Sequence, residues 1–286
     1  MKLGRPVVIT FVLCGCVVGV LWVVSLIGER WLLPCVQQGN RRAIVPADPS
    51  YEIVSLRTKD GTKIIGQFGK AEPQTVEPDR DGAHAPTLIL FYGKGVTLSR
   101  FQGEFDELRA MGVNVFIPEF PGVGMSEGKG SESQYYATAD AALDYLLGRM
   151  DIDHDRIIAV GGSLGAGTAV DLASRRTLAG LISIGGFTNA PDTLAGVYFW
   201  LPRWGADLLM ARCRFDNLTK IKSVTCPILL IYGTSDTIVP PEMAERLALA
   251  AKGPVTKLPV ASSHGSLLKN SKFTVNATVH DWLHAR

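Results

Sequence analysis

From Thr87 onward, short apolar runs alternate with longer stretches that have the spacing of amphipathic helices. The apolar runs lack the alternating polar residues of a strand with one face in water, which indicates strands buried on both faces. Strand and helix repeated in this order predict an α/β fold, a mostly parallel central sheet flanked by helices. The expected strands are 87–92, 113–117, 156–161, 178–185, 226–233 and 255–260, and the expected helices are 99–112, 131–150, 164–176, 240–253 and 267–284.

Upstream of this pattern, residues 51–68 form two β-rich runs around Lys59-Asp60-Gly61, which predicts a hairpin. A chain of 286 residues with 47% hydrophobic residues can build one large core. We therefore expect one domain at 51–286, after a connector at 29–50 and a separate segment at 1–28. A net charge of +2 and the absence of a long basic run argue against nucleic-acid binding.

The N-terminal segment contains an uncharged apolar run at 7–27, long enough for a helix that crosses a bilayer once. An uncleaved membrane anchor is the favoured interpretation. A signal peptide and a lipid anchor at Cys16 are the alternatives. Lys2 and Arg5 precede the run, but Arg30 and further arginines follow it, so the charge rule does not decide the orientation. The short basic N-terminus favours a catalytic domain on the extracytoplasmic side.

Two segments contain Gly-x-Ser-x-Gly, centred on Ser126 and Ser163. Ser126 lies in a glycine-rich loop with no strand before it, so a structural role is expected. Ser163 follows an apolar strand and immediately precedes a helix, the context of a nucleophile elbow, where the hydroxyl stands above the sheet beside a helix N-terminus. The alternative for Ser163 is a close-packed or phosphate-binding turn.

A serine nucleophile needs a base, and the base needs an acid that fixes its tautomer. Asp236 follows the expected strand 226–233, and His264 follows the expected strand 255–260. The carboxyl ends of parallel strands share one edge of the sheet, so Ser163, Asp236 and His264 are predicted to converge as a triad. Taken singly, Asp236 could be an ordinary turn residue and His264 a surface residue.

The motifs together resemble those of membrane-anchored α/β-hydrolases of the bud-emergence and palmitoyl-thioesterase-like group. The resemblance runs from about Tyr51 to the end and rests on the sequences DGTKIIGQF, LILFYGKG, PGVGMSEG, GGSLGAG, YGTSDTIVP and SSHG. It implies an oxyanion hole built from the backbone N–H groups of Leu164 and of the Lys94 region. Tyr92 stands where the family usually has a histidine, a change that is expected to affect loop shape more than activity.

Residues 186–222 form a short apolar insertion between two expected strands, and in the family's fold such an insertion caps the active site. Tyr198, Phe199 and Trp200 are the predicted substrate-binding residues. One interpretation is a small helical cap that packs on the sheet. The other is an acyl pocket or a lip that faces the membrane, which would suit a tethered enzyme that acts on small-molecule or lipidic acyl substrates.

The sequence therefore predicts a serine hydrolase for esters or thioesters that acts through an acyl-enzyme, with no metal or organic cofactor. One alternative is a serine peptidase of the prolyl-oligopeptidase or aminopeptidase type, which uses the same triad. The other is a binding protein that has the fold without the activity.

Overall fold

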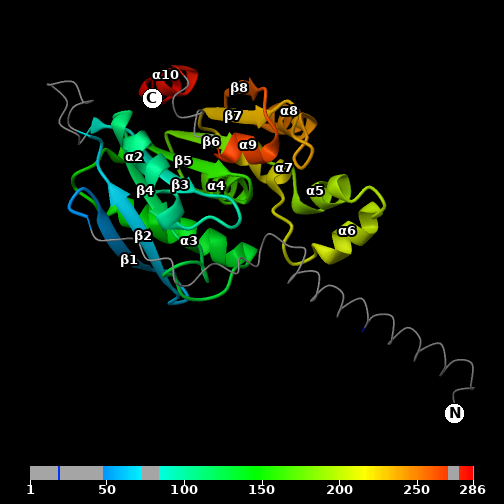
Figure 1. Cartoon of the computed structure of the whole chain (residues 1–286), viewed down its shortest axis with the longest axis horizontal. Helices are drawn as coiled ribbons and strands as arrows, with labels where there is room; N and C mark the ends of the chain where they lie inside the picture. Colours follow the sequence, from blue (N-terminus) through cyan, green and yellow to red (C-terminus); the bar gives the residue numbers. More distant parts are fainter. Residues whose placement is uncertain (1–18, 20–47, 73–83, 270–276, 286) are drawn as a thin grey trace, which may run out of the picture.

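The computed structural model describes residues 19, 48–72, 84–269 and 277–285 (Figure 1). Apart from residue 19, the expected anchor lies outside the described residues, as does most of the connector. Among the residues that are described, no helix combines the length and the hydropathy needed to cross a membrane.

The centre of the domain is an eight-stranded sheet with the order β1-β2-β4-β3-β5-β6-β7-β8. The pairs β1–β2 and β2–β4 are antiparallel, and every other neighbouring pair is parallel. This arrangement confirms the predicted mostly parallel sheet. The strands are β1 (Glu52–Arg57), β2 (Lys63–Gly69), β3 (Thr87–Phe91), β4 (Asn114–Pro118), β5 (Ile157–Gly162), β6 (Gly180–Ile184), β7 (Ile228–Gly233) and β8 (Val255–Val260).

The expected hairpin is formed by β1 and β2, in which Glu52 pairs with Phe68 and Arg57 with Lys63. The turn between them is closed by a hydrogen bond from the Gly61 N–H to the Thr58 carbonyl oxygen at 2.8 Å. Gly61 has a φ of 86°, a left-handed conformation that glycine adopts without steric cost.

Helices cover both faces of the sheet (Figure 1). Ser131 caps one of them by accepting the Gln134 N–H at 3.2 Å, as the Ser-x-x-Gln pattern predicts. The α-helices are α2 (Gln102–Ala110), α3 (Glu132–Leu147), α4 (Leu164–Arg175), α5 (Ala190–Val197), α6 (Arg203–Leu209), α7 (Asn217–Lys220), α8 (Pro241–Ala250), α9 (His264–Lys269) and α10 (Ala277–His284). Short 3₁₀ turns occupy η2 (Leu98–Arg100), η3 (His154–Arg156) and η4 (Ile221–Ser223).

The start of the C-terminal helical region differs from the expectation of a helix over 267–284. Helix begins at His264, earlier than expected, and the described parts of the region are helical over His264–Lys269 and Ala277–His284, while residues 270–276 lie outside the described ranges. The first three residues of this helix, His264, Gly265 and Ser266, are not apolar, so the periodicity that predicts a helix begins only at Leu267.

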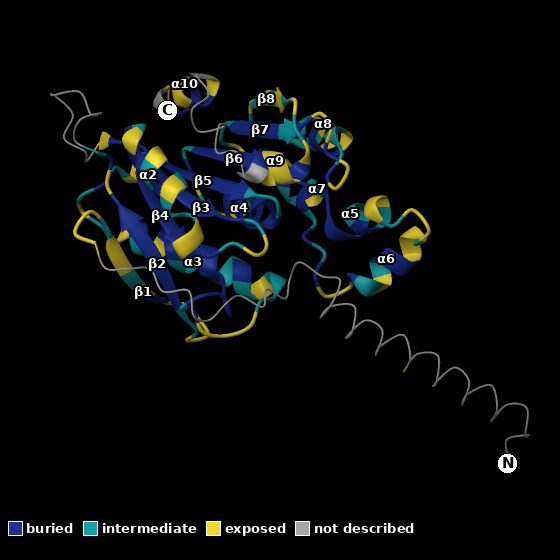
Figure 2. Ribbon diagram, in the orientation of Figure 1, coloured by how far each residue is buried: buried dark blue, intermediate teal, exposed yellow. Residues whose placement is uncertain are grey.

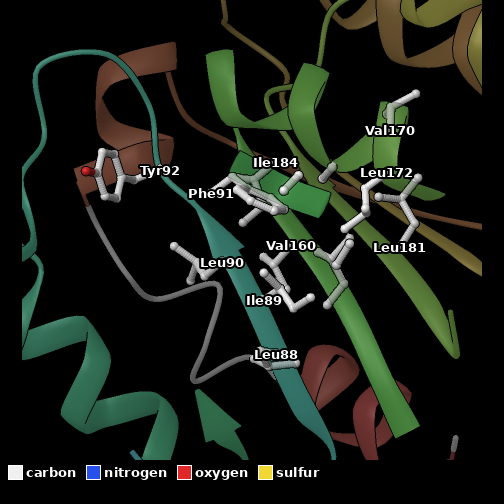
Figure 3. Close-up of a cluster of buried hydrophobic side chains, with 14 of the residues drawn as sticks. Leu88, Ile89, Leu90, Phe91, Tyr92, Val160, Val170, Leu172, Leu181 and Ile184 are labelled. Atoms are coloured by element: carbon white, nitrogen blue, oxygen red, sulfur yellow. The ribbon is translucent and has the colours of Figure 1, made fainter. Parts of the chain in front are cut away.

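The core lies between the central strands and the helices that cover them. Strand residues such as Ile89 and Val160, and Leu172 of α4, are at most 2% exposed. Figure 3 shows these side chains packed together, and Figure 2 shows that the central strands are buried along their length. Burying one such aliphatic side chain contributes about 1.5–3 kcal/mol, so this cluster fixes the spacing between the strands and α4.

The insertion between β6 and β7 folds as a cap made of α5 and α6, which stand beside one end of the sheet (Figure 1). Two backbone hydrogen bonds close its base, from the Ala190 N–H to the Arg214 oxygen at 2.7 Å and from the Leu218 N–H to the Thr188 oxygen at 2.9 Å. The two ends of the cap segment are thus joined to each other where they leave the sheet.

Candidate active site

Ser163 occupies the sharp turn between β5 and α4. Its backbone has φ 50° and ψ −115°, and it is one of two non-glycine residues with positive φ among those described. A conformation of this kind costs about 1–3 kcal/mol and persists only where the surroundings enforce it. Here the Ser163 N–H donates to the Ile184 carbonyl oxygen at 2.8 Å, which ties the turn to β6.

The glycines on each side of Ser163 allow α4 to pack unusually close to the sheet. A Cβ atom on Gly161 would overlap the backbone of Gly165, and a Cβ atom on Gly165 would overlap the carbonyl oxygen of Phe91. The Gly-x-Ser-x-Gly pattern is therefore required by the contact between β5, α4 and β3. This geometry is that of the nucleophile elbow expected at Ser163.

His264 begins α9 and lies within hydrogen-bond distance of Ser163, because its Nε2 is 2.9 Å from the Ser163 Oγ. Its Nδ1 is 2.6 Å from Oδ2 of Asp236. Both His264, at 9% exposure, and Asp236, at 4%, are buried. The structure brings together the three side chains that the sequence analysis selected.

The carboxylate of Asp236 is held on both oxygens. Oδ1 accepts the N–H groups of Ile238 at 2.9 Å and Val239 at 2.8 Å, which leaves Oδ2 for the imidazole. An ionised carboxylate only accepts hydrogen bonds, so Nδ1 of His264 carries the proton and Nε2 is free to accept one from Ser163. This is the tautomer that a general base for Ser163 needs.

Two cavities meet at Ser163, and both are also lined by Lys94, from the loop after β3. The first, of about 260 Å³, lies under the cap and is lined mainly by apolar side chains. The second, of about 300 Å³, lies on the His264 side. The cap cavity is lined by Lys94, Ser163, Leu164, Phe187, Ala190, Thr193, Leu194, Val197, Tyr198, Met210, Ile238 and Val239.

Of the predicted substrate-binding residues, only Tyr198 lines the cap cavity. Phe199 and Trp200 follow the end of α5 in a turn that directs them outward, and they are 92% and 68% exposed. The structure therefore does not place Phe199 and Trp200 in the wall of this cavity, and their exposure fits the other interpretation, an outward-facing lip. Sequence reasoning missed Leu194 and Met210, because they reach the cavity from separate helical segments of the cap.

The residues expected at the oxyanion hole lie beside the nucleophile. Leu164 is the first residue of α4, where a backbone N–H has no acceptor within the helix. Lys94 and Leu164 both line the cap cavity with Ser163. Their positions are compatible with N–H groups that stabilise negative charge next to the serine hydroxyl.

The second Gly-x-Ser-x-Gly segment has a structural role in the described domain. The Ser126 hydroxyl accepts the Ile65 N–H at 2.9 Å and donates to the Glu119 carbonyl oxygen at 3.1 Å. It thereby joins this loop to β2. Ser126 is buried and lies outside the lining of both cavities at Ser163.

Glu119, which sequence reasoning missed, connects this loop to the one that carries Lys94. Its side chain is 0% exposed and accepts the N–H groups of Leu98 at 3.2 Å and Met125 at 2.7 Å. Burial raises the pKa of Glu119 to about 6, although the two N–H donors oppose that shift.

Tyr92, the residue after β3, fills the space beside Glu119. Its hydroxyl accepts the Phe120 N–H at 3.4 Å, and its ring meets the Phe120 ring edge-on at 5.4 Å between centroids. Burial raises the pKa of Tyr92 well above its ordinary value, so the phenol is neutral. Tyr92 acts as a packing residue here, and the loop after it still places Lys94 beside Ser163.

No group of three or more His, Cys, Asp or Glu side chains is placed to hold a metal ion within the described ranges 48–72, 84–269 and 277–285.

Residues 101–285 match the sequence profile of the prolyl oligopeptidase family. This chain belongs to that family. An uncharacterised protein of Mycobacterium tuberculosis is 33% identical over 72% of this chain and 69% of its own length. Alpha/beta hydrolase domain-containing protein 17B of Xenopus tropicalis is 29% identical over 74% of this chain and 68% of its own length.

Among solved structures, an esterase of Pyrococcus furiosus superposes with a TM-score of 0.65. It is 20% identical to this chain, and the match covers 86% of this chain and 98% of the esterase. At this identity the similarity shows the fold alone. The predicted α/β-hydrolase fold is thus confirmed, and the family is one of hydrolases.

Proposed function

We propose that this chain is a serine hydrolase that cleaves carboxylic esters or thioesters through an acyl-enzyme. The observation that carries the proposal is the hydrogen-bonded series from Ser163 through His264 to Asp236, with distances of 2.9 and 2.6 Å. It lies at the junction of two cavities, which gives the two halves of a substrate separate places to bind.

In the first half-reaction the Ser163 hydroxyl attacks the acyl carbonyl carbon while Nε2 of His264 removes its proton. The oxyanion forms beside the N-terminus of α4, where the N–H of Leu164 and an N–H of the Lys94 region can donate to it. The imidazolium then protonates the leaving alcohol or thiol. Asp236 stabilises this cation and keeps the ring in place.

In the second half-reaction water attacks the acyl-enzyme while His264 again acts as base. The ester bond to Ser163 breaks, the proton returns to the serine oxygen, and the carboxylic acid leaves. No step of this cycle needs a metal or an organic cofactor.

An acyl substrate fits the cap cavity better than an aminoacyl substrate does. Lys94 carries the only charged side chain among the described residues that line this cavity. A free amino group on the substrate would therefore meet a cation and no carboxylate. An apolar acyl chain would instead contact Leu194, Val197 and Tyr198. The similarity to palmitoyl-thioesterase-like hydrolases in the sequence motifs supports the same choice.

Peptide cleavage is the second candidate function, because the family profile is that of a peptidase family. Turnover of acyl esters and of aminoacyl amides by the same preparation separates the two candidates. We expect measurable turnover of p-nitrophenyl acyl esters and none of aminoacyl amides. The reverse result would make this chain a peptidase.

A fluorophosphonate probe tests the catalytic assignment, since it labels only an activated serine. We expect labelling of the wild type and of Ser126→Ala, and none of Ser163→Ala. The Ser126 variant is the matched control, because it changes the other serine in the same sequence pattern. Absence of labelling in folded wild-type protein would favour a binding protein without catalytic activity.

We further propose that residues 7–27 anchor the chain in a membrane, with the hydrolase domain on the extracytoplasmic side. The uncharged length of this run and the basic residues before it support the proposal. Protease treatment of intact cells is the test. The domain should be degraded from outside, and protection until the cells are lysed would place it in the cytoplasm.

A further inference from the structure

The tip of the cap exposes a cluster of large apolar side chains. Among the described residues, ten large hydrophobic side chains are exposed, and five of these lie within 197–208. We call these five residues the cap tip: Val197, Phe199, Trp200, Trp204 and Leu208. Three of them are aromatic, and Phe199, at 92% exposure, has almost no contact with the protein. Figure 2 shows exposed positions on α5, α6 and the turn between them, at the side of the molecule away from β1. A cluster of this kind marks a binding surface.

The cap tip is continuous with the mouth of the cap cavity. Val197 belongs to both, and Tyr198 lines the cavity while its ring packs edge-on against Trp200 at 5.8 Å. Ile238, another exposed apolar residue at 45%, lines the same cavity from the β7 side. An apolar molecule held at the cap tip is therefore next to the opening that leads to Ser163.

Ion pairs within the cap hold the tip in its exposed position. Arg203 pairs with Asp192 at 2.9 Å and with Asp207 at 2.6 Å, which links the start of α6 to α5. Arg214 pairs with Asp207 at 3.0 Å, and Arg246 of α8 pairs with Asp192 at 3.2 Å. The aromatic side chains are thus presented by a braced pair of helices.

We propose that the cap tip inserts into the interfacial region of a lipid bilayer, so that an acyl chain passes from the lipid into the cap cavity. The proposal rests on the proposed ester or thioester hydrolysis. Tryptophan is enriched at the boundary between headgroups and acyl chains, and Trp, Phe and Leu are the apolar side chains that interfacial helices bury there. Residues 190–214 carry three arginines and two aspartates, so the cap is not repelled by anionic lipids.

The rest of the chain favours a bilayer over another partner. The apolar run 7–27 is followed by 28–47 before the described domain begins at Asp48. Twenty residues span at most about 70 Å when fully extended, so an anchored chain keeps the cap within reach of the membrane. Insertion of the tip would turn the cavity mouth toward the surface in which the run is anchored.

A double variant, Phe199→Ser with Trp204→Ser, tests the proposal in the full chain reconstituted into phosphatidylcholine and phosphatidylglycerol vesicles. Neither residue lines either cavity at Ser163. The matched control is Met150→Ser with Leu249→Ser, two side chains at 95% and 87% exposure that lie outside the cap. Trp200 is left unchanged, because it contacts Tyr198 in the cavity wall.

Each protein is assayed with a long-chain acyl ester embedded in the vesicles and with a short, soluble acyl ester. We expect the cap-tip variant to lose at least tenfold in turnover of the embedded ester and to stay within twofold of wild type on the soluble ester. The control should match wild type on both. Equal losses on the two esters, or no loss on either, would overturn the proposal.

Quenching by brominated lipids tests the docking without reference to activity. If Trp204 enters the bilayer, brominated lipids quench its emission. The wild type should then lose more tryptophan emission on brominated vesicles than Trp204→Phe does. Equal quenching of wild type and Trp204→Phe would contradict insertion of the cap tip. If the wild type also formed dimers and the Phe199→Ser, Trp204→Ser variant did not, the cap tip would instead be a contact between two copies of the chain. Absence of turnover of the soluble ester by wild type would refute the proposed function alone.

Discussion

The buried carboxyl of Glu119 makes the stability of this fold depend on pH in a direction that can be calculated. Its pKa is raised by burial from an ordinary value of 4.5 to about 6. A tenfold change in proton affinity is worth about 1.4 kcal/mol, so the difference corresponds to about 2 kcal/mol. The native state binds this proton more tightly than the unfolded chain does.

The sign follows from that difference in proton affinity. Below pH 4.5 the carboxyl is protonated in both states, and its full contribution of about 2 kcal/mol to the unfolding free energy is present. As the pH rises through 4.5 to 6, the unfolded chain loses its proton first. The contribution is lost over this window and is gone above pH 6. This is the reverse of the usual behaviour of a carboxylate in an ion pair.

The variant Glu119→Gln removes the titration and keeps the shape. Its amide oxygen can accept only one of the N–H groups of Leu98 and Met125, and its NH₂ group faces the other. That mismatch costs about 1–3 kcal/mol at any pH. The absolute stability of the variant is therefore less informative than its pH dependence.

The assay is urea denaturation of wild type and variant between pH 4 and pH 7.5. The other titratable groups are the same in the two proteins, so their contributions cancel when the unfolding free energy of the variant is subtracted from that of wild type at each pH. We expect the unfolding free energy of wild type relative to the variant to fall by about 2 kcal/mol from pH 4 to pH 7. A difference that stays constant, or that rises with pH, would refute the account of Glu119 as a carboxyl destabilised by burial.

Three further predictions concern the site and its supports. Asp236→Asn should lower turnover by several orders of magnitude, on the scale of about 10⁴-fold seen when the acid of such a triad is removed, with the fold retained by circular dichroism. Gly165→Ala should destabilise the domain by about 3 kcal/mol, the upper end of the usual cost of overpacking a core, because its new Cβ would overlap the Phe91 carbonyl. Gly196→Ala is its control, since nothing beyond its own turn of helix lies within 4 Å of that Cβ, and it should stabilise α5 by about 0.5–1 kcal/mol in the same denaturation assay. Ser126→Ala should lower the unfolding free energy by about 1–3 kcal/mol, because the buried Ile65 N–H loses its acceptor. Its turnover of acyl esters should stay at the wild-type level, and a loss of turnover in the folded variant would contradict its structural role.

The parallel sheet and the meeting of Ser163 with His264 could be predicted because both follow from local patterns. Apolar runs without alternation identify buried strands, and residues just past the ends of parallel strands share one edge of the sheet. The strand-turn-helix context also separated Ser163 from Ser126. These arguments need only the order of the elements along the chain.

The role of Glu119 could not be read in the same way, because its burial results from the packing of three segments. In the sequence it is a charged residue before a glycine-rich loop, a position where exposure is the ordinary expectation. The lining of the cap cavity also depends on the packing of separate segments. Leu194 and Met210 meet across it only after α5 and α6 have packed, and no periodicity predicts which of their neighbours, such as Phe199, will face outward.

The triad and most of the wall of the cap cavity come from different segments of the chain, so mutations can change them separately. Ser163, Asp236 and His264 are positioned by β5, β7 and β8, whereas the wall under the cap is built largely between Phe187 and Met210. Mutations in that interval can enlarge, shrink or reshape the space for a substrate without altering the spacing of the reacting atoms. Related enzymes can therefore diverge in what they accept while they share one chemistry, and an exchanged cap is the natural starting point for engineering a new preference.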